Sequence, residues 1–241
     1  MGTTLGEDIV LLAITEDGRL AGGPRLRFAL AGAELVQLAA ARRVDVVDGR
    51  IQVLDPAPTG EKLLDAALRD IAGDKRPPQA TKWVARPRSL VDSYLEQLVA
   101  RGIVRRETRK VLRVFLTLRW NVIDTAPAEQ ARERLDAVAF SSGPVDTLES
   151  AFGALAHTTG LGNLIYPDGR NARFDAARAR LKQIARRDPT ATAVHTSAER
   201  AAADAAFNAA VDASVHAAVS ASVHAVHHAA HDGGASGGGH H

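Results

Sequence analysis

The sequence contains no cysteine among its 241 residues, and this absence removes several classes of protein. Disulfide-stabilised folds, thiol catalysis and cysteine-based zinc sites are all excluded. Uninterrupted apolar runs are short as well, so the sequence offers no candidate for a bilayer-spanning helix. The first ten residues, MGTTLGEDIV, lack the basic-then-apolar order of a secretory signal. We therefore expect a cytoplasmic protein.

An excess of charge of one sign is also missing, because the formal net charge is only +2 at pH 7. Binding of a polyanion must then depend on local clusters of cations rather than on the field of the whole protein. Lysine occurs at only five positions, so arginine carries almost all of the positive charge. Abundant arginine and alanine are typical of GC-rich genomes, which predicts a bacterial source.

Recognisable catalytic motifs are absent. The sequence has no phosphate-binding loop, dinucleotide fingerprint, HExxH, GxSxG or paired-carboxylate motif. We therefore expect a protein that is not an enzyme and uses no cofactor; an enzyme would need side chains from distant segments to converge in a pocket. We interpret Glu7, Asp8, Asp65 and Glu149 as helix caps, helix-dipole partners or solvated residues, and His157 as a core or surface histidine.

What is present is a series of segments with helical periodicity. The pattern predicts a mainly α, single globular helical domain with short β-hairpins over residues 1–212, then a helical His-rich extension and a flexible Gly-rich tail over 213–241. Alternating residues around Asp48-Gly49 predict the clearest hairpin, over 44–54. Helices are expected over 5–13, 28–43, 59–71 with Thr59 as N-cap, 90–101, 128–140, 147–157, 171–187 and 197–228.

The segment from Leu90 to Trp120 combines an apolar-faced helix with a basic hairpin. Apolar residues recur at helical spacing in its first part, and Gly102 follows where a helix end favours positive φ. We expect Ile103-Val104 and residues 111–118 to form strands joined by a polar turn over 105–110. Such a surface attracts a polyanion, either a membrane or DNA. Its cations are Arg105, Arg106, Arg109, Lys110, Arg113 and Arg119, interleaved with Val111, Leu112, Val114 and Phe115.

One hypothesis places this segment on DNA as a winged helix. Residues 90–101 would be the recognition helix, and the hairpin over 103–118 would lie on the phosphate backbone as the wing. The helix itself argues against this use, because its polar face carries Asp92 and Glu96, which repel phosphate. The competing hypothesis places the hairpin on an anionic membrane.

Histidines form a stripe near the end of the sequence. If the helix continues, they fall within roughly 120° of arc, and the i, i+4 pairs His224/His228 and His227/His231 have the spacing at which two imidazoles share a divalent metal. Asp232 is the only nearby carboxylate, so these residues are weak metal candidates and no metal site is predicted. The stripe consists of His216, His224, His227, His228 and His231.

Five segments resemble, in the same order, those of a known family. They read LGEDIVLLAI, LAGAELVQLAAARRV, DPAPTGEKLLDAALRDI, LVARGIVRRE and ARARLKQIARRDP, and PTGEKLLDAAL is the most specific. Over residues 3–212 the chain resembles the Golgi phosphoprotein 3 family. The resemblance implies a mostly helical domain that binds phosphatidylinositol 4-phosphate at membranes through a basic pocket. Eukaryotic members of that family also bind short cytosolic tails of Golgi glycosyltransferases.

The resemblance implies a headgroup pocket built from a tryptophan and three arginines. Arg88 stands at one arginine position, whereas Ala31 and Val91 stand at the other two, and no tryptophan precedes Phe28 in the matching loop. Neighbouring arginines can complete the site, because guanidinium groups suit phosphate. The predicted headgroup-binding residues are Arg88, Arg86, Arg25 and Arg27.

The same resemblance assigns the basic hairpin to membrane contact or self-association. We expect an anionic phospholipid membrane, a second copy of the chain and a protein client of unknown identity as partners, and we do not favour nucleic acid. These expectations describe a non-enzymatic cytoplasmic protein that associates peripherally with a membrane. The hairpin residues predicted for this role are Arg105, Arg109, Lys110, Val111, Leu112 and Arg113.

Overall fold

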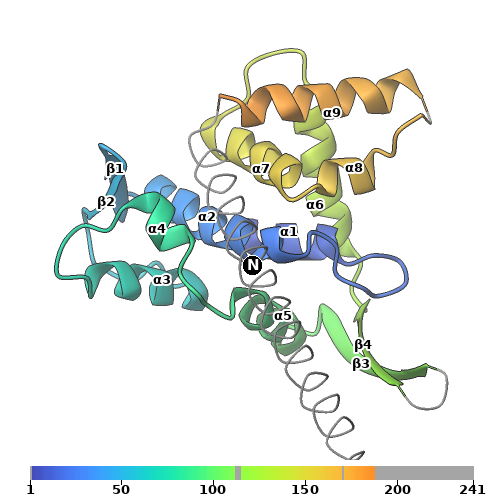
Figure 1. Cartoon of the computed structure of the whole chain (residues 1–241), viewed down its shortest axis with the longest axis horizontal. Coiled ribbons are helices and arrows are strands. Elements are labelled where there is room, and N and C mark those ends of the chain that lie inside the picture. Colours follow the sequence, from blue (N-terminus) through green and yellow to red (C-terminus); the bar gives the residue numbers. More distant parts are fainter. Residues whose placement is uncertain (1, 112–114, 170, 188–241) are drawn as a thin grey trace, which may run out of the picture. The chain divides into compact units, whose positions relative to one another are not determined.

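The computed structural model describes residues 2–111, 115–169 and 171–187. These residues form nine helices and two separate antiparallel hairpins (Figure 1). None of these helices combines the length and apolarity that crossing a membrane requires. The helices are α1 (Leu5–Ala13), α2 (Pro24–Ala40), α3 (Lys62–Ala72), α4 (Ala80–Val84), α5 (Leu90–Ala100), α6 (Ala126–Ala139), α7 (Thr147–Thr158), α8 (Leu161–Ile165) and α9 (Ala172–Ala185), and the strands are β1 (Val44–Val47), β2 (Arg50–Val53), β3 (Val104–Val111) and β4 (Phe115–Val122).

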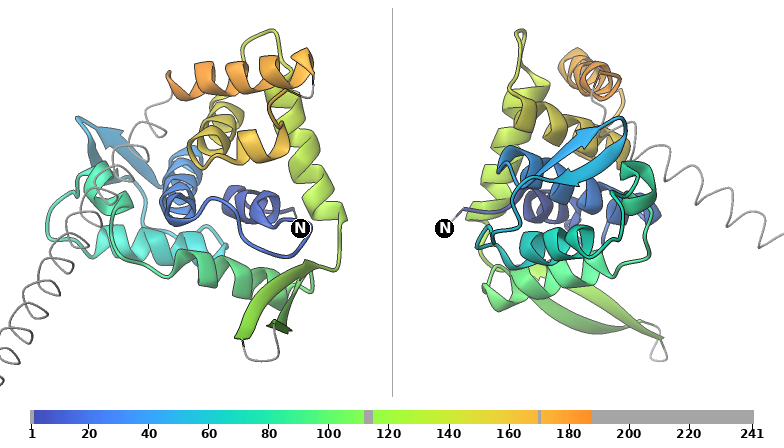
Figure 2. Two further views of the ribbon diagram at one scale, coloured as in Figure 1. Left: turned by 45° about the vertical axis from the view of Figure 1, so that its right-hand side comes forward. Right: turned by 90° about the vertical axis from the view of Figure 1, so that its left-hand side faces the viewer.

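Helices α1 and α2 form the centre of the described fold. Almost every residue of α1 is buried, and α2 is buried along most of its length. Helices α6, α7, α8 and α9 lie to one side of this pair, and α3, α4, α5 and the first hairpin lie to the other (Figure 1, Figure 2). The β3–β4 ribbon extends away from the end of α5. The predicted mainly α-helical class with short hairpins is confirmed.

A capping box fixes the start of α1. The Thr4 hydroxyl accepts a hydrogen bond from the Glu7 backbone N–H at 3.3 Å, and the Glu7 carboxylate accepts one from the Thr4 backbone N–H at 2.8 Å. Each residue thus satisfies a donor that the first helical turn leaves without a partner. The predicted helix over 5–13 and the interpretation of Glu7 as a cap are both confirmed.

Helix α2 begins at Pro24, four residues before its predicted start at Phe28. Proline suits this position because the first turn of a helix does not need its N–H, and its fixed φ already matches the helix. Gly23 precedes it with a φ of 50°, a conformation that glycine adopts without strain. Arg25 and Arg27 therefore lie in the first turn of α2 and not in a loop.

The first hairpin matches the prediction. Asp48 and Gly49 connect β1 and β2 with φ values of 50° and 72°, and positive φ at both central residues is what a type I′ turn requires. Val47 pairs with Arg50 directly beside the turn. The Asp-Gly signal therefore located this hairpin correctly.

The N-terminus predicted for α3 was wrong. The helix begins at Lys62, and Thr59 does not cap it. Thr59 instead donates two hydrogen bonds to Oδ1 of Asp65, from its backbone N–H at 2.6 Å and from its hydroxyl at 2.7 Å. The Asp65 side chain therefore reaches back from the first helical turn and fixes the preceding loop.

The basic hairpin also differs from its predicted form. Residues 105–110, expected as a turn, belong to strand β3, whose register with β4 runs from Val104 opposite Val122 to Val111 opposite Phe115. The polar residues 105–110 suggested a turn, but a two-stranded ribbon that extends into solvent can contain polar residues on both faces. Predicted hairpin residues Leu112 and Arg113 lie outside the described residues.

Two further predictions fall on parts of the chain outside the described residues. These are the helix expected over 197–228 and the boundary between 212 and 213. The candidate metal ligands of the histidine stripe, His224, His227, His228 and His231, lie there too. Within the described ranges, His, Asp and Glu side chains form no group of three or more that could hold a metal ion.

Candidate anion-binding site

Two arginines and a tryptophan meet where α2, α3, α4 and α5 come together. Trp83 belongs to α4, and Arg86 and Arg88 lie in the short segment that leads from α4 into α5. Helix α2 packs against α3, α4 and α5, and these three helices lie on one side of it in Figure 1. Contacts with acidic residues of α2 and α3 fix both arginines.

Arg88 is the most enclosed cation of this group. Its Nη1 donates a hydrogen bond of 2.8 Å to Oε2 of Glu34 on α2. Its guanidinium carbon lies 4.2 Å from the centroid of the Trp83 ring, a cation–π contact. Its Nε and Nη2 are buried and have no hydrogen-bond partner among the described residues. One edge of the guanidinium is thus paired, and the adjacent edge retains unused donors.

Arg86 belongs to a network that orients Trp83. Its Nη1 lies 2.9 Å from Oδ2 of Asp70, and its Nη2 lies 2.5 Å from Oδ2 of Asp74. The same Oδ2 of Asp70 accepts a hydrogen bond of 2.7 Å from the Trp83 indole N–H. Asp70 therefore holds both the aromatic ring under Arg88 and the neighbouring arginine.

Acidic groups outnumber cations in this cluster. Two guanidinium groups, from Arg86 and Arg88, face three carboxylates, from Glu34, Asp70 and Asp74. The Glu34 side chain is only 2% exposed. Burial raises the pKa of the Glu34 carboxyl to about 7, although the charge of Arg88 opposes this rise. The charge that Glu34 brings to this cluster therefore depends on pH close to neutrality.

The other two predicted arginines occupy different faces of α2. Arg27 precedes Glu34 by seven residues, about two turns, which places the two on the same face roughly 10 Å apart along the axis. Its guanidinium carbon lies 4.1 Å from the Phe28 ring centroid. Arg25 is exposed and, nine residues before Glu34, lies on the opposite face. Among the predicted set, the contacts thus bring Arg86 and Arg88 together.

At the two other positions where the family resemblance implies an arginine, this chain has apolar residues that contribute no charge. Ala31 is 1% exposed within α2, and Val91 lies partly buried in the first turn of α5. An arginine at position 31 would have to replace a small core side chain. No tryptophan precedes Phe28, and the tryptophan that lies beside Arg88 is Trp83, which comes from a different segment.

Sequence reasoning missed the acidic partners of this site. Glu34 was visible as a single acid in the apolar stretch ALAGAELVQLAA, and a buried carboxylate needs a partner. That signal could have identified Glu34. Asp70 and Asp74 gave no comparable signal, because an acid near the end of an amphipathic helix is ordinarily solvated.

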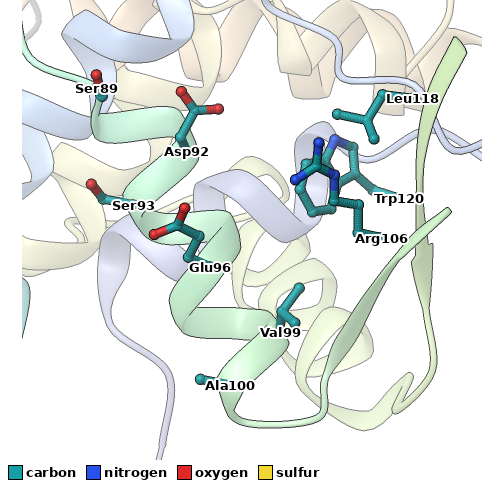
Figure 3. Close-up of a pocket in the computed structure, with 9 residues that line it drawn as sticks. All are labelled: Ser89, Asp92, Ser93, Glu96, Val99, Ala100, Arg106, Leu118 and Trp120. Atoms are coloured by element: carbon teal, nitrogen blue, oxygen red, sulfur yellow. The ribbon is translucent and has the colours of Figure 1, made fainter. Parts of the chain in front are cut away.

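A hollow with a volume of about 720 Å³ lies elsewhere, between α5 and the β3–β4 ribbon. Figure 3 shows Asp92 and Glu96 projecting from α5, with Arg106 and Trp120 facing them from the two strands. Arg106 and Trp120 are directly paired in the strand register. The complete lining is Ser89, Asp92, Ser93, Glu96, Val99, Ala100, Arg106, Leu118 and Trp120.

The hairpin presents its described cations at the surface. Arg105 and Arg106 are exposed, and Arg119 is partly exposed. Arg105 makes only a long contact with Glu107, 3.9 Å between Nε and Oε1. The side chains of the predicted contact residues Arg109, Lys110 and Val111 lie outside the described part of the chain.

Comparison with known proteins agrees with the resemblance that the sequence motifs carry. The family model that matches is described as Golgi phosphoprotein 3 (GPP34), and it covers residues 5–213. No curated protein matches the chain. Because the match extends over most of the 241 residues, the chain belongs to the Golgi phosphoprotein 3 (GPP34) family.

Proposed function

We propose that the protein binds a phosphoinositide or another anionic lipid headgroup at a membrane surface, without catalysing a reaction, and that Arg88 contacts the phosphate. Membership of the Golgi phosphoprotein 3 family supports this proposal. The observation that carries it is the pair of unused donors on Arg88, Nε and Nη2. No other arginine in the described residues has two buried donors without partners.

The chemistry of these donors fits a phosphate group. Nε–H and Nη2–H point from the same edge of a planar guanidinium, and this fork matches two oxygens of a phosphate. Buried donors without partners cost free energy, so a ligand that accepts from them recovers that cost. Both atoms are covered by protein, and contact with a phosphate therefore requires Arg88 or its neighbours to shift.

The ribbon supplies a second contact with the membrane in this proposal. The β3–β4 ribbon extends from the body of the protein (Figure 2), and the described cations Arg105, Arg106 and Arg119 lie in the half of the ribbon next to α5. Each basic residue near an anionic bilayer contributes about 1 kcal/mol of attraction. The same ribbon is our candidate surface for self-association.

The contacts of α5 make DNA the less favoured partner. Arg101, at the end of this helix, donates to both carboxylate oxygens of Glu7, at 2.7 and 2.8 Å. The exposed face of α5 carries Asp92 and Glu96. A helix that presents carboxylates and pairs its terminal arginine internally repels a phosphate backbone.

Flotation with lipid vesicles tests the proposal. We expect the wild-type protein to float with phosphatidylcholine vesicles that contain phosphatidylinositol 4-phosphate, and Arg88→Ala to lose roughly tenfold in affinity, the cost of a charge-assisted contact. Arg186→Ala, an exposed arginine at the end of α9, is the matched control and should bind normally. A parallel gel shift with random duplex DNA measures the competing activity. DNA binding without vesicle binding would overturn the proposal.

A further inference from the structure

Glu34 occupies the position from which its own charge offsets that of Arg88. Its Oε2 accepts from Arg88 Nη1 at 2.8 Å, on the guanidinium edge next to the unused Nε and Nη2. The carboxylate is almost completely covered, whereas 19% of the Arg88 side chain is exposed. Glu34 therefore neutralises the proposed anion site from inside the protein.

The surroundings of Glu34 do not offer it a second cation. Arg88 and Asp70 are the charged groups that act on its carboxylate, and Asp70, on α3, is itself shared between Trp83 and Arg86. From α5, the buried Tyr94 brings a neutral hydroxyl with no hydrogen-bond partner among the described residues. Helices α1, α4 and α7 and strand β1, which also pack against α2, bring no charged side chain of the described chain that acts on Glu34.

This arrangement opposes the entry of an anion while Glu34 is ionised. Three carboxylates then face the two arginines, so a phosphate would meet excess negative charge. Protonation of Glu34 leaves two carboxylates and two guanidinium groups. It also replaces a charge–charge contact with a weaker hydrogen bond, which makes movement of Arg88 toward a ligand less costly.

We propose that binding of an anionic headgroup at Arg88 is coupled to the uptake of one proton by Glu34. The proton comes from solvent and binds a carboxylate oxygen of Glu34, and no other covalent bond changes. The inference rests on the proposed function, because it concerns the same arginine. It makes headgroup affinity fall as pH rises above neutrality.

Burial supports this coupling, since it raises the pKa of Glu34 to about 7. If the bound state holds Glu34 protonated, the wild type loses roughly tenfold in affinity between about pH 6 and about pH 8. The chain also has nine histidines, which gain charge over the same range and strengthen binding to anionic surfaces at low pH. The test must therefore compare variants that share those histidines.

The experiment measures partition of the full-length protein onto phosphatidylcholine vesicles that contain phosphatidylglycerol. This phosphodiester headgroup does not titrate near neutral pH, so any change in affinity comes from the protein. Glu34→Gln imitates the protonated residue, and we expect it to match the wild type near pH 6 and bind roughly tenfold tighter near pH 8. Asp74→Asn is the matched control, because it removes a negative charge from the same cluster at a more accessible carboxylate. The affinity of Asp74→Asn relative to that of the wild type should be the same at both pH values.

Each alternative outcome is decisive. If Arg88→Ala weakens vesicle binding but the affinity of Glu34→Gln relative to that of the wild type stays constant with pH, the coupling is wrong and the proposed function stands. If Arg88→Ala binds like the wild type, the proposed site and the coupling both fail. A lipid-free control uses a Trp120→Phe background, so that fluorescence reports Trp83, which is stacked on Arg88. That fluorescence should change with a midpoint near neutral pH, and Glu34→Gln should abolish the change. The absence of that change would also overturn the coupling.

Discussion

Gly6 of α1 packs directly against the aromatic ring of Tyr94 of α5. A Cβ atom at position 6 would lie 2.4 Å from both Cε1 and Cζ of Tyr94 and 2.5 Å from its hydroxyl oxygen. Tyr94 is itself 1% exposed, so its ring has no free space into which it could move. The absence of a side chain at Gly6 therefore sets how closely α1 approaches the helix that follows the anion site.

Replacing Gly6 with alanine should destabilise the protein by about 1–3 kcal/mol, because the added methyl group overpacks a filled core. Urea denaturation monitored by circular dichroism measures the free energy of unfolding. Gly143→Ala is the control, since nothing lies within 4 Å of a Cβ built at that position. A Gly6→Ala variant as stable as Gly143→Ala would show that α1 and α5 do not pack this closely.

Arg101→Ala should cost about 3–5 kcal/mol of stability, because it leaves the buried carboxylate of Glu7 without its cation. Glu7 is fully covered, and Arg101 contacts both of its oxygens. Arg105→Ala removes an arginine whose pairing with Glu107 is long and exposed, and it should cost less than about 1 kcal/mol. Thermal unfolding of the two variants gives the comparison. Equal effects would contradict a structural role for the Glu7–Arg101 pair.

Glu34→Gln should stabilise the protein at alkaline pH. Burial raises the pKa of this carboxyl from its usual value of 4.5 to about 7 in the folded protein. Protonation of Glu34 therefore contributes its full share to the free energy of unfolding below the lower pKa. That stability is lost as pH rises through the upper value. Because glutamine cannot ionise, its advantage over the wild type should grow from near zero at the lower pKa to about 3 kcal/mol above the upper one.

Urea denaturation of both proteins across this pH range measures the difference. A wild type that is more stable than Glu34→Gln at alkaline pH would mean that the ionised pair with Arg88 outweighs the burial of the carboxylate. The pKa of Glu34 would then not be raised, and proton-coupled binding would lose its support.

Periodicity in the sequence was sufficient for most of the fold. Helices such as α3 and α5 bury one regularly spaced apolar face, and the positive φ values at Asp48 and Gly49 follow from the residue types alone. Two errors at helix N-termini have identifiable causes in single side chains. Asp65 binds Thr59 and so moves the expected cap, and Pro24 starts α2 in a segment that its glycines made look irregular.

The candidate site was harder to predict because its contacts join residues far apart in sequence. Arg88 meets Glu34 across 54 positions, and Trp83 reaches Asp70 from another helix. Motif resemblance singled out Arg88, but spacing along the chain could not show that its partner is the buried acid Glu34. Proximity in sequence also grouped Arg25 with Arg27, although helical geometry separates them by half a turn.

We propose that the guanidinium fork of Arg88 binds an anionic headgroup, and Arg88→Lys tests this binding mode most directly. Lysine keeps the positive charge but cannot present two parallel donors. We predict that Arg88→Lys loses roughly tenfold in affinity for vesicles that contain phosphatidylinositol 4-phosphate, as Arg88→Ala does. Wild-type affinity in Arg88→Lys would contradict this binding mode.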